Sequence, residues 1–214
     1  MENLRHYYKT QSAIYDATRW AFLFGRTQLL RELAKIEPNP RHVVEIGCGT
    51  GRNLAILAGL FPQARITGVD LSANMLAIAA AKTAPFGDRV MLQLRVQGGA
   101  FEVPHDVVVF SYSLSMMNTG WDVVLRGAVD GLEPWGLVAA VDFHDSALRL
   151  FKWHMSRHHV RMDRHLLPAL GAACRVEVSE VRTAYSGLWK YFLFVGRKDP
   201  ALPRPAPSAN DSRK

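Results

Sequence analysis

A glycine-rich loop and two carboxylates are the residues of this 214-residue chain whose spacing most clearly indicates chemistry. The stretch VVEIGCGTG, residues 43–51, is an apolar run that contains Glu45 and then breaks into glycines at alternate positions. Such a run predicts a buried strand that turns sharply into a helix, where the backbone can approach a ligand closely. Asp70 ends the next strand-like run, ITGVD, so we expect both acids at one edge of a parallel sheet.

The two acids separate two classes of nucleotide ligand. A loop of the G-x-G-x-x-G type wraps a pyrophosphate, and a carboxylate at Glu45 would repel that anion. A cationic ligand suits an acid at this position better. We therefore expect a positive charge near Glu45.

Apolar runs alternate with helical stretches from residue 43 onward, which is typical of a doubly wound α/β sheet with right-handed crossovers. The expected strands are 43–46, 64–70, 90–94, 106–114 and 137–143, the expected helices are 53–60, 73–82 and 122–132, and a turn is expected at 133–136. Residues 174–185 and 188–198 are strand-like runs joined by Ser-Gly, which predicts an antiparallel hairpin. The whole pattern predicts a mostly parallel, seven-stranded sheet closed by a C-terminal hairpin.

Composition suits one globular domain. Hydrophobic residues make up 49% of the chain and charged residues 21%. We expect an N-terminal helical cap over residues 1–40, the main domain over 41–198, and a disordered, proline-rich tail over 199–214. Two cysteines indicate neither a disulfide framework nor a zinc cluster, and no apolar run is long enough to span a membrane. A cytoplasmic setting follows as the expectation.

The loop, the acid in GVDLS and the C-terminal hairpin resemble the class I S-adenosylmethionine-dependent methyltransferases. The resemblance implies S-adenosylmethionine as cofactor and S-adenosylhomocysteine as product. It places Asp70 on the ribose hydroxyls, Leu71 and Met75 beside the adenine, and Gln97 or a backbone carbonyl at the adenine amino group. The cofactor-binding residues that it implies are Glu45, Gly47, Cys48, Gly49, Thr50, Gly51, Asn53, Asp70, Leu71, Met75, Gln97 and Ser111.

Nucleic acid and metal ions are disfavoured as partners, because the sequence lacks the motifs that bind them. No N-P-P-Y or D-P-P-Y motif follows the fourth strand, so we do not expect nucleic acid as a partner despite the net charge of +7. The histidines at positions 154, 158, 159 and 165 stand among arginines and lysines without a matching acid or thiolate set. We interpret them as a basic face and expect no metal.

The N-terminal stretch HYYKTQSAIYDATRWAFLFGR, with SYSLSMM and VDFHD, resembles the bacterial diacylglyceryl-homoserine (betaine lipid) N-methyltransferases, and more loosely the phosphatidylethanolamine N-methyltransferases. This narrower resemblance implies successive methylation of a lipid headgroup amine. A soluble small-molecule N- or O-methyltransferase is the main alternative. Tyr15 and Tyr112 are the aromatic residues expected to face the methylated cation. His144 is expected to accept or relay the amine proton, with Asp142 as the candidate partner that orients it.

Positive charge among aromatic residues also predicts contact with an anionic membrane surface. The N-terminal segment and residues 148–166 each combine basic and apolar positions at helical spacing. We therefore expect a peripheral enzyme on the inner face of the membrane, with an amine-headgroup lipid as substrate. The enzyme that makes the lipid precursor is a candidate partner.

Overall fold

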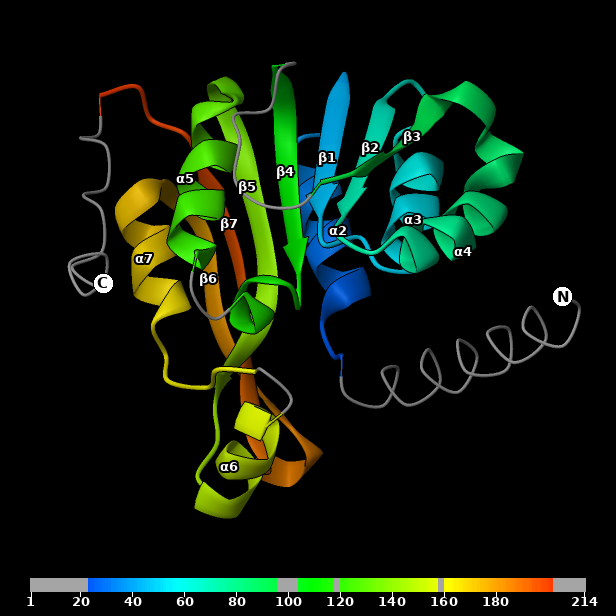
Figure 1. The fold of residues 1–214 in the computed structure, drawn as a ribbon. Helices are drawn as coiled ribbons and strands as arrows, with labels where there is room; N and C mark the ends of the chain where they lie inside the picture. The colour runs from blue at the N-terminus through cyan, green and yellow to red at the C-terminus, as the bar shows by residue number, and fades with distance from the viewer. Residues whose placement is uncertain (1–22, 96–103, 118–119, 158–159, 202–214) are drawn as a thin grey trace, which may run out of the picture.

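A seven-stranded mixed sheet with helices on both faces organises the computed structural model, which describes residues 23–95, 104–117, 120–157 and 160–201 (Figure 1). The strands are β1 (His42–Ile46), β2 (Arg65–Asp70), β3 (Val90–Leu94), β4 (His105–Ser111), β5 (Leu132–Asp145), β6 (Arg175–Ala184) and β7 (Trp189–Arg197). Their order in the sheet is β3-β2-β1-β4-β5-β7-β6. Strands β1 to β5 pair in parallel, whereas β7 is antiparallel to both of its neighbours. The predicted fold class and C-terminal hairpin are confirmed.

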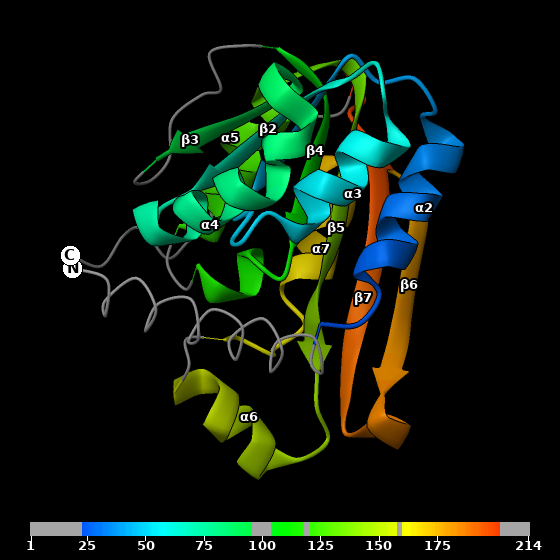
Figure 2. The same cartoon turned by 90° about the vertical axis from the view of Figure 1, so that its right-hand side faces the viewer.

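Helices cover both faces of this sheet (Figures 1 and 2). They are α2 (Arg26–Ile36), α3 (Arg52–Leu60), α4 (Ala73–Thr83), α5 (Trp121–Asp130), α6 (Arg149–Arg157) and α7 (Leu166–Ala173), with short 3₁₀ turns η1 (Ala84–Arg89), η2 (Leu114–Met116) and η3 (Tyr185–Gly187). Strand β5 shows why two layers form, because its successive side chains point to opposite faces. Val141 and Phe143 join the apolar cluster of α2, α3 and α4, and Val138 and Ala140 join that of α5 and α7.

Two expected boundaries are wrong because of single backbone angles, and one expected amphipathic segment is divided. The turn expected at 133–136 lies inside β5, where Trp135 takes a left-handed φ of 66° and the register against β4 shifts. The fourth strand ends at Ser111, because Tyr112 takes a φ of 54°. The basic segment 148–166 is not one helix, since α6 ends at Arg157 and α7 begins at residue 166. None of the helices that the structure describes has the length and hydrophobicity of a membrane span.

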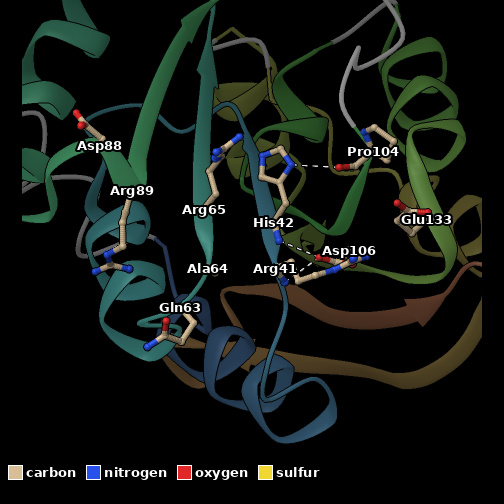
Figure 3. Close-up of a pocket in the computed structure, with 10 residues that line it drawn as sticks. All are labelled: Arg41, His42, Gln63, Ala64, Arg65, Asp88, Arg89, Pro104, Asp106 and Glu133. Carbon is tan, nitrogen blue, oxygen red and sulfur yellow. Dashed lines mark hydrogen bonds and ion pairs between the residues drawn. The ribbon is translucent and has the colours of Figure 1, made fainter.

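A shallow hollow at the amino-terminal edge of the sheet is lined by charged residues (Figure 3). Asp106 accepts hydrogen bonds of 2.8 Å from the backbone N–H groups of both Arg41 and His42, and the His42 ring contacts Thr67 Oγ1 at 2.8 Å. Three arginines there are balanced by three acids. These contacts fasten β1 to its neighbours, at the edge opposite to the glycine loop, so we interpret the hollow as structural.

Candidate cofactor and acceptor site

The glycine loop between β1 and α3 has the backbone that only glycine adopts easily. Gly47, Gly49 and Gly51 all take left-handed φ angles, of 77°, 54° and 75°. A Cβ on Gly47 would stand 2.5 Å from the Ser113 side chain, and one on Gly51 would stand 2.8 Å from Ala79 in α4. The loop therefore packs too closely against the segment after β4 and against α4 to carry side chains at these two positions.

Asp70 holds this loop at the end of β2. Its Oδ2 accepts a 2.8 Å hydrogen bond from the Gly49 N–H, and its Oδ1 accepts one of 2.9 Å from the Ser72 N–H. The next side chain, Leu71, is 73% exposed, and Met75 on α4 is half-buried. The carboxylate retains lone pairs for further donors, with apolar surface beside it, which suits a ribose and an adenine ring.

Glu45 is buried at the base of the crevice and has an unused hydrogen-bonding atom. Its Oε1 accepts a 2.7 Å hydrogen bond from Asn53 Nδ2, but its Oε2 has no partner within the described residues. Asn53 Oδ1 and the Ser111 and Ser113 hydroxyls are likewise buried without partners in that part of the chain. Buried polar atoms are normally satisfied, so a group of them around one crevice indicates a polar ligand. The crevice is lined by Leu23, Arg26, Glu45, Gly47, Cys48, Gly49, Thr50, Arg52, Asn53 and Ser111.

Charge at the base of the crevice is set by burial. Burial raises the pKa of Glu45 to about 8, against the hydrogen bond from Asn53 and the charge of Arg26, which lower it. A ligand ammonium beside Glu45 would favour the ionised carboxylate. Arg26, the first residue of α2, faces the same crevice and is suited to a ligand carboxylate. Sequence reasoning missed Arg26, because it lies 19 positions before Glu45 and only the fold brings them together.

The remaining loop residues are placed as follows. The backbone N–H of Cys48 donates to Val69 O at 3.0 Å, and burial raises the pKa of its thiol, so the thiol is a packing group. Thr50 is buried and its hydroxyl accepts a 3.3 Å hydrogen bond from Lys82 Nζ. Gln97 lies outside the described residues, so the contact to the adenine amino group stays a prediction.

Tyr112 is buried at the end of β4, with its hydroxyl donating a 2.8 Å hydrogen bond to Phe24 O. Its ring packs edge-on against Phe143 with centroids 4.8 Å apart. These contacts tie β4 and β5 to the chain just before α2, so the hydroxyl already has a structural role. Whether the ring also contacts an acceptor cation stays a prediction, and Tyr15 lies outside the described residues.

His144 and Asp142, near the end of β5, have different surroundings. Burial, followed by the charge of Arg164, lowers the pKa of His144, and its Nδ1 has no partner within the described residues. A lowered pKa favours the neutral imidazole, which is the form that can accept a proton. Asp142 does not orient it, because Asp142 accepts hydrogen bonds from the N–H groups of Ser115 and Phe143 and fixes the η2 turn instead. Burial raises the pKa of Asp142 to about 6.

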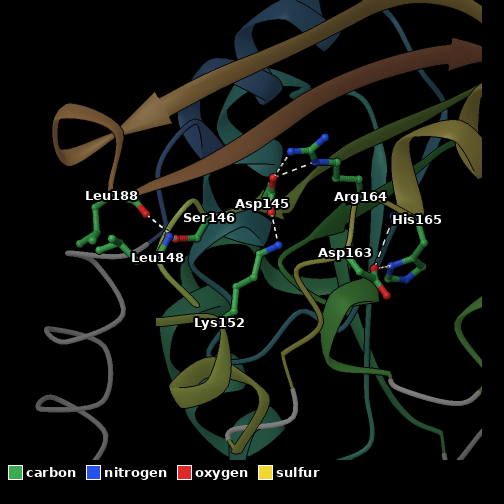
Figure 4. A network of polar contacts seen from close by, with 8 residues as sticks. All are labelled: Asp145, Ser146, Leu148, Lys152, Asp163, Arg164, His165 and Leu188. Carbon is green, nitrogen blue, oxygen red and sulfur yellow. Dashed lines mark hydrogen bonds and ion pairs between the residues drawn. The ribbon is translucent and has the colours of Figure 1, made fainter. Parts of the chain in front are cut away.

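A polar network fastens α6 and the segment 160–165 to the end of β5 (Figure 4). Asp145 pairs with Lys152 of α6 and with Arg164, whose backbone N–H donates to His144 O at 3.1 Å. Ser146 Oγ accepts a hydrogen bond from Leu148 N–H and donates one to Leu188 O in the β6–β7 turn. One short stretch of chain thus holds three segments at the carboxyl edge of the sheet.

Replacing Asp145 by Asn is expected to lower the free energy of unfolding by about 1–2 kcal/mol, because its two cations are partly exposed and can be solvated. Burial alone would raise the pKa of Asp145, but the bonds from Lys152 and Arg164 hold it well below its usual range. The ionised carboxylate is therefore stabilising above about pH 4, and this contribution is lost as the pH falls further. Urea unfolding at several pH values measures the difference.

The matched control is Glu180→Gln, which removes a carboxylate from an exposed pair with Arg182 and should change stability by less than about 0.5 kcal/mol. A difference between wild type and Asp145→Asn that persists unchanged well below pH 4 would contradict the assignment.

Solved structures with this fold contain S-adenosylhomocysteine, the product of the expected cofactor. The chain is similar to the N-methyltransferase NodS from Bradyrhizobium japonicum WM9, solved with S-adenosylhomocysteine, with a TM-score of 0.67, 18% identity, and coverage of 81% of this chain and 85% of that one. It is also similar to 1,6-didemethyltoxoflavin-N1-methyltransferase from Burkholderia thailandensis, with a TM-score of 0.66, 18% identity, and coverage of 92% and 89%. At these identities the likeness shows the fold.

Sequence comparison points to the same family. Residues 44–138, which hold the glycine loop, Asp70 and β4, match a family model described as a methyltransferase domain. The matched segment thus carries a methyltransferase-type sequence on the class I methyltransferase fold. The chain is also similar to a trans-aconitate 2-methyltransferase of Streptomyces avermitilis, with 32% identity over 114 residues. This match covers 52% of this chain and 42% of that relative. The chain thus spans less than half the length of this curated relative. The predicted enzyme class and cofactor are confirmed.

The site residues of the methyltransferase domain fit S-adenosylmethionine. The unpaired Glu45 Oε2 and Asn53 Oδ1 can accept from the α-ammonium, and Arg26 can bind the α-carboxylate. Asp70 can accept from the ribose hydroxyls, and Leu71 and Met75 offer apolar contact to the adenine. No group of three or more His, Cys, Asp or Glu suited to a metal ion occurs among the residues that the structure describes.

Binding of S-adenosylhomocysteine is expected to tighten about tenfold per pH unit between pH 6 and 8, because the ammonium requires an ionised Glu45 whose pKa is about 8. Each binding event should release a proton, detectable by calorimetry in two buffers of different ionisation enthalpy. In the free protein, a rise in pH has the opposite effect, because it lowers the folding stability. The folded carboxyl keeps its proton up to about pH 8 and the unfolded one loses it near 4.5, so stability falls as pH rises through this window.

The control for this dependence is Glu45→Gln, which keeps the shape and removes the titration. Its affinity should be lower at pH 8 and nearly flat from pH 6 to 8. An equally steep pH dependence in Glu45→Gln would show that Glu45 is not the group whose titration controls binding.

Proposed function

We propose that this chain transfers a methyl group from S-adenosylmethionine to a small, diffusible acceptor that reaches the cofactor at the carboxyl edge of β4 and β5. The observation that carries the proposal is a set of buried polar atoms around the glycine loop that have no partner among the described residues, with Glu45 at its base. That set accounts for the cofactor. The kind of acceptor is inferred from the residues that border the same edge of the sheet.

The names of similar proteins support a small acceptor. The curated relatives act on trans-aconitate, a small polycarboxylate, and the Burkholderia neighbour acts on 1,6-didemethyltoxoflavin. A phosphoethanolamine N-methyltransferase of Haemonchus contortus, at a TM-score of 0.62, was solved with phosphomonomethylethanolamine, which is also a small diffusible compound. These names favour the small-molecule alternative over methylation of a lipid headgroup.

When bound, S-adenosylmethionine supplies an activated methyl group on a sulfonium. The chain's own contribution is mainly positioning, because alignment of acceptor and methyl group lowers the barrier to transfer. Asp70 and Glu45 would hold the two ends of the cofactor, and the close packing of Gly47 against Ser113 would fix the loop between them. Asp142 holds the η2 turn beside this loop through the Ser115 N–H, so the segment after β4 is rigid at the acceptor side.

His144 is suited to acceptors that must lose a proton. A neutral imidazole with a free Nδ1 can accept a proton from an ammonium or hydroxyl, whereas a carboxylate acceptor needs no base. Replacing His144 by Asn in the assay below therefore distinguishes the two kinds of nucleophile, since only amine or hydroxyl methylation should slow.

Methylation of diacylglyceryl-homoserine remains a second candidate, because the carboxyl edge also carries an exposed apolar and basic helix. Leu150 and Trp153 on α6 are 76% and 55% exposed, next to Arg149 and Arg157. A lipid headgroup could reach the cofactor from a membrane on that side. The number of methyl groups transferred and the headgroup would follow from the same assay.

A methyl-transfer assay with labelled S-adenosylmethionine tests both candidates. The panel would contain trans-aconitate and related polycarboxylates, small primary and secondary amines, and, in mixed micelles, diacylglyceryl-homoserine and phosphatidylethanolamine. We expect label in a soluble compound, dependent on Asp70. Label confined to diacylglyceryl-homoserine would overturn the small-molecule proposal in favour of the second candidate, and label in neither class, with cofactor binding intact, would contradict both.

A further inference from the structure

Helix α6 and the β6–β7 turn lie beyond the carboxyl edge of the sheet (Figures 1 and 2). Their exposed side chains form an apolar and basic surface. Four large apolar side chains there are about half exposed or more: Leu148 (51%), Leu150 (76%), Trp153 (55%) and Tyr185 (52%). Together with Arg149 and Arg157 we call these residues the α6 surface. A concentration of exposed apolar residues on neighbouring elements generally marks a site of interaction.

The α6 surface includes the side of α6 that does not pack against the rest of the domain. Phe151 stacks on the buried Trp189 with ring centroids 5.4 Å apart, and Lys152 pairs with Asp145. Tyr185 flanks Trp189 from the turn, with centroids 4.9 Å apart. The inward side of α6 is thus accounted for by contacts with β5 and β7. Leu150 and Trp153, three positions apart in α6, lie on the other side and share it with Arg157.

The charge of this surface has one sign. Helix α6 reads RLFKWHMSR, with two arginines, one lysine and no acid. The Arg157 guanidinium lies over the Trp153 ring, 4.8 Å from its centroid, so cation and aromatic ring form one unit. A helix with tryptophan and leucine next to arginines, and without acids, matches the interface of an anionic bilayer, where the ring enters the headgroup layer and the cations meet lipid phosphates.

We propose that the α6 surface docks the protein on an anionic lipid bilayer, with the carboxyl edge of the sheet toward the membrane. Charge complementarity favours this occupant over a second copy of the chain, because two α6 surfaces placed face to face would bring like charges together. The docking adds to the proposed methyl transfer and does not depend on it. A soluble acceptor and an anchored enzyme are compatible.

Vesicle flotation tests the docking, with phosphatidylcholine vesicles that contain a third of phosphatidylglycerol compared with pure phosphatidylcholine. We expect binding to the anionic vesicles at low salt and release at high salt. Trp153→Asn should weaken this binding at least about tenfold, because the ring that enters the interface is lost. The charge reversal Arg149→Glu with Arg157→Glu should abolish it. Trp153 should also account for quenching of tryptophan fluorescence by brominated lipids.

The matched control is Trp135→Asn, which removes another half-exposed tryptophan, located within β5 and 48% exposed. It should bind vesicles like wild type, and all variants should bind S-adenosylhomocysteine, which shows that they are folded. Failure of the wild type to bind anionic vesicles at low salt, or equal binding by Trp153→Asn, would overturn the proposal. So would a concentration-dependent dimer in sedimentation that Trp153→Asn abolishes, since it would assign the surface to self-association.

Discussion

Replacing Asp70 by Ala is expected to weaken binding of S-adenosylhomocysteine by roughly a hundredfold or more. The carboxylate performs two tasks, because it accepts from the N–H groups of Gly49 and Ser72 and would also accept from the ribose hydroxyls. Hydrogen bonds to a charged group are each worth about 1.5–3 kcal/mol, and a loss of about 3 kcal/mol corresponds to this change in affinity. Isothermal calorimetry at pH 8 measures it.

The control variant is Asp88→Ala, which removes an exposed acid at the opposite edge of the sheet and should leave the affinity unchanged. Urea unfolding must accompany both variants, since the loop contacts of Asp70 also contribute to stability. A folded Asp70→Ala protein that binds S-adenosylhomocysteine as tightly as wild type would remove Asp70 from the cofactor site.

Replacing Gly51 by Ala is expected to destabilise the protein by about 3 kcal/mol. The residue takes a φ of 75°, which costs an L-residue about 1–2 kcal/mol. The added Cβ would also stand 2.8 Å from the Ala79 Cβ and 2.9 Å from its Cα, so α3 and α4 would have to separate, at a further cost of about 1–3 kcal/mol. Urea unfolding, with the midpoint and slope compared with wild type, measures the effect.

Gly59→Ala is the matched control in the same helix, α3. A Cβ at Gly59 meets nothing within 4 Å, and the residue is exposed in the last turn of α3. Alanine there should stabilise the protein by up to about 1 kcal/mol, so the two substitutions should have opposite signs. If Gly51→Ala were as stable as wild type, the close packing of the loop against α4 would be contradicted.

Much of the fold could be predicted because its signals are local. The run before Glu45, the run that ends at Asp70 and the Ser-Gly step at residues 186–187 each mark an element by neighbouring residue types. The boundaries that failed depend on single backbone angles. Trp135 and Tyr112 adopt left-handed φ values that their residue types disfavour, and tertiary packing imposes them. No pattern in the sequence reveals such positions.

The site likewise contains residues that local motifs reveal and residues that only the fold brings together. Glu45, Asp70 and the glycines lie within a stretch of 26 residues, in two consecutive strand-to-helix turns, and the resemblance of these motifs implied the cofactor. Arg26 lines the crevice and Ser113 packs against Gly47, each from a distant segment and without a spacing signal in the sequence. The expected pairing of Asp142 with His144 was wrong, because Asp142 faces the η2 turn and accepts the Ser115 N–H there. Sequence proximity along a strand did not predict contact.

The most direct test of the cofactor assignment is an experimental structure of the protein with S-adenosylhomocysteine bound. We predict the ligand between the glycine loop and Asp70, with its ammonium within hydrogen-bond distance of Glu45 Oε2, its ribose hydroxyls on Asp70 and its carboxylate near Arg26. Ligand bound elsewhere, or bound in the crevice with Glu45 Oε2 still unpaired, would contradict the account.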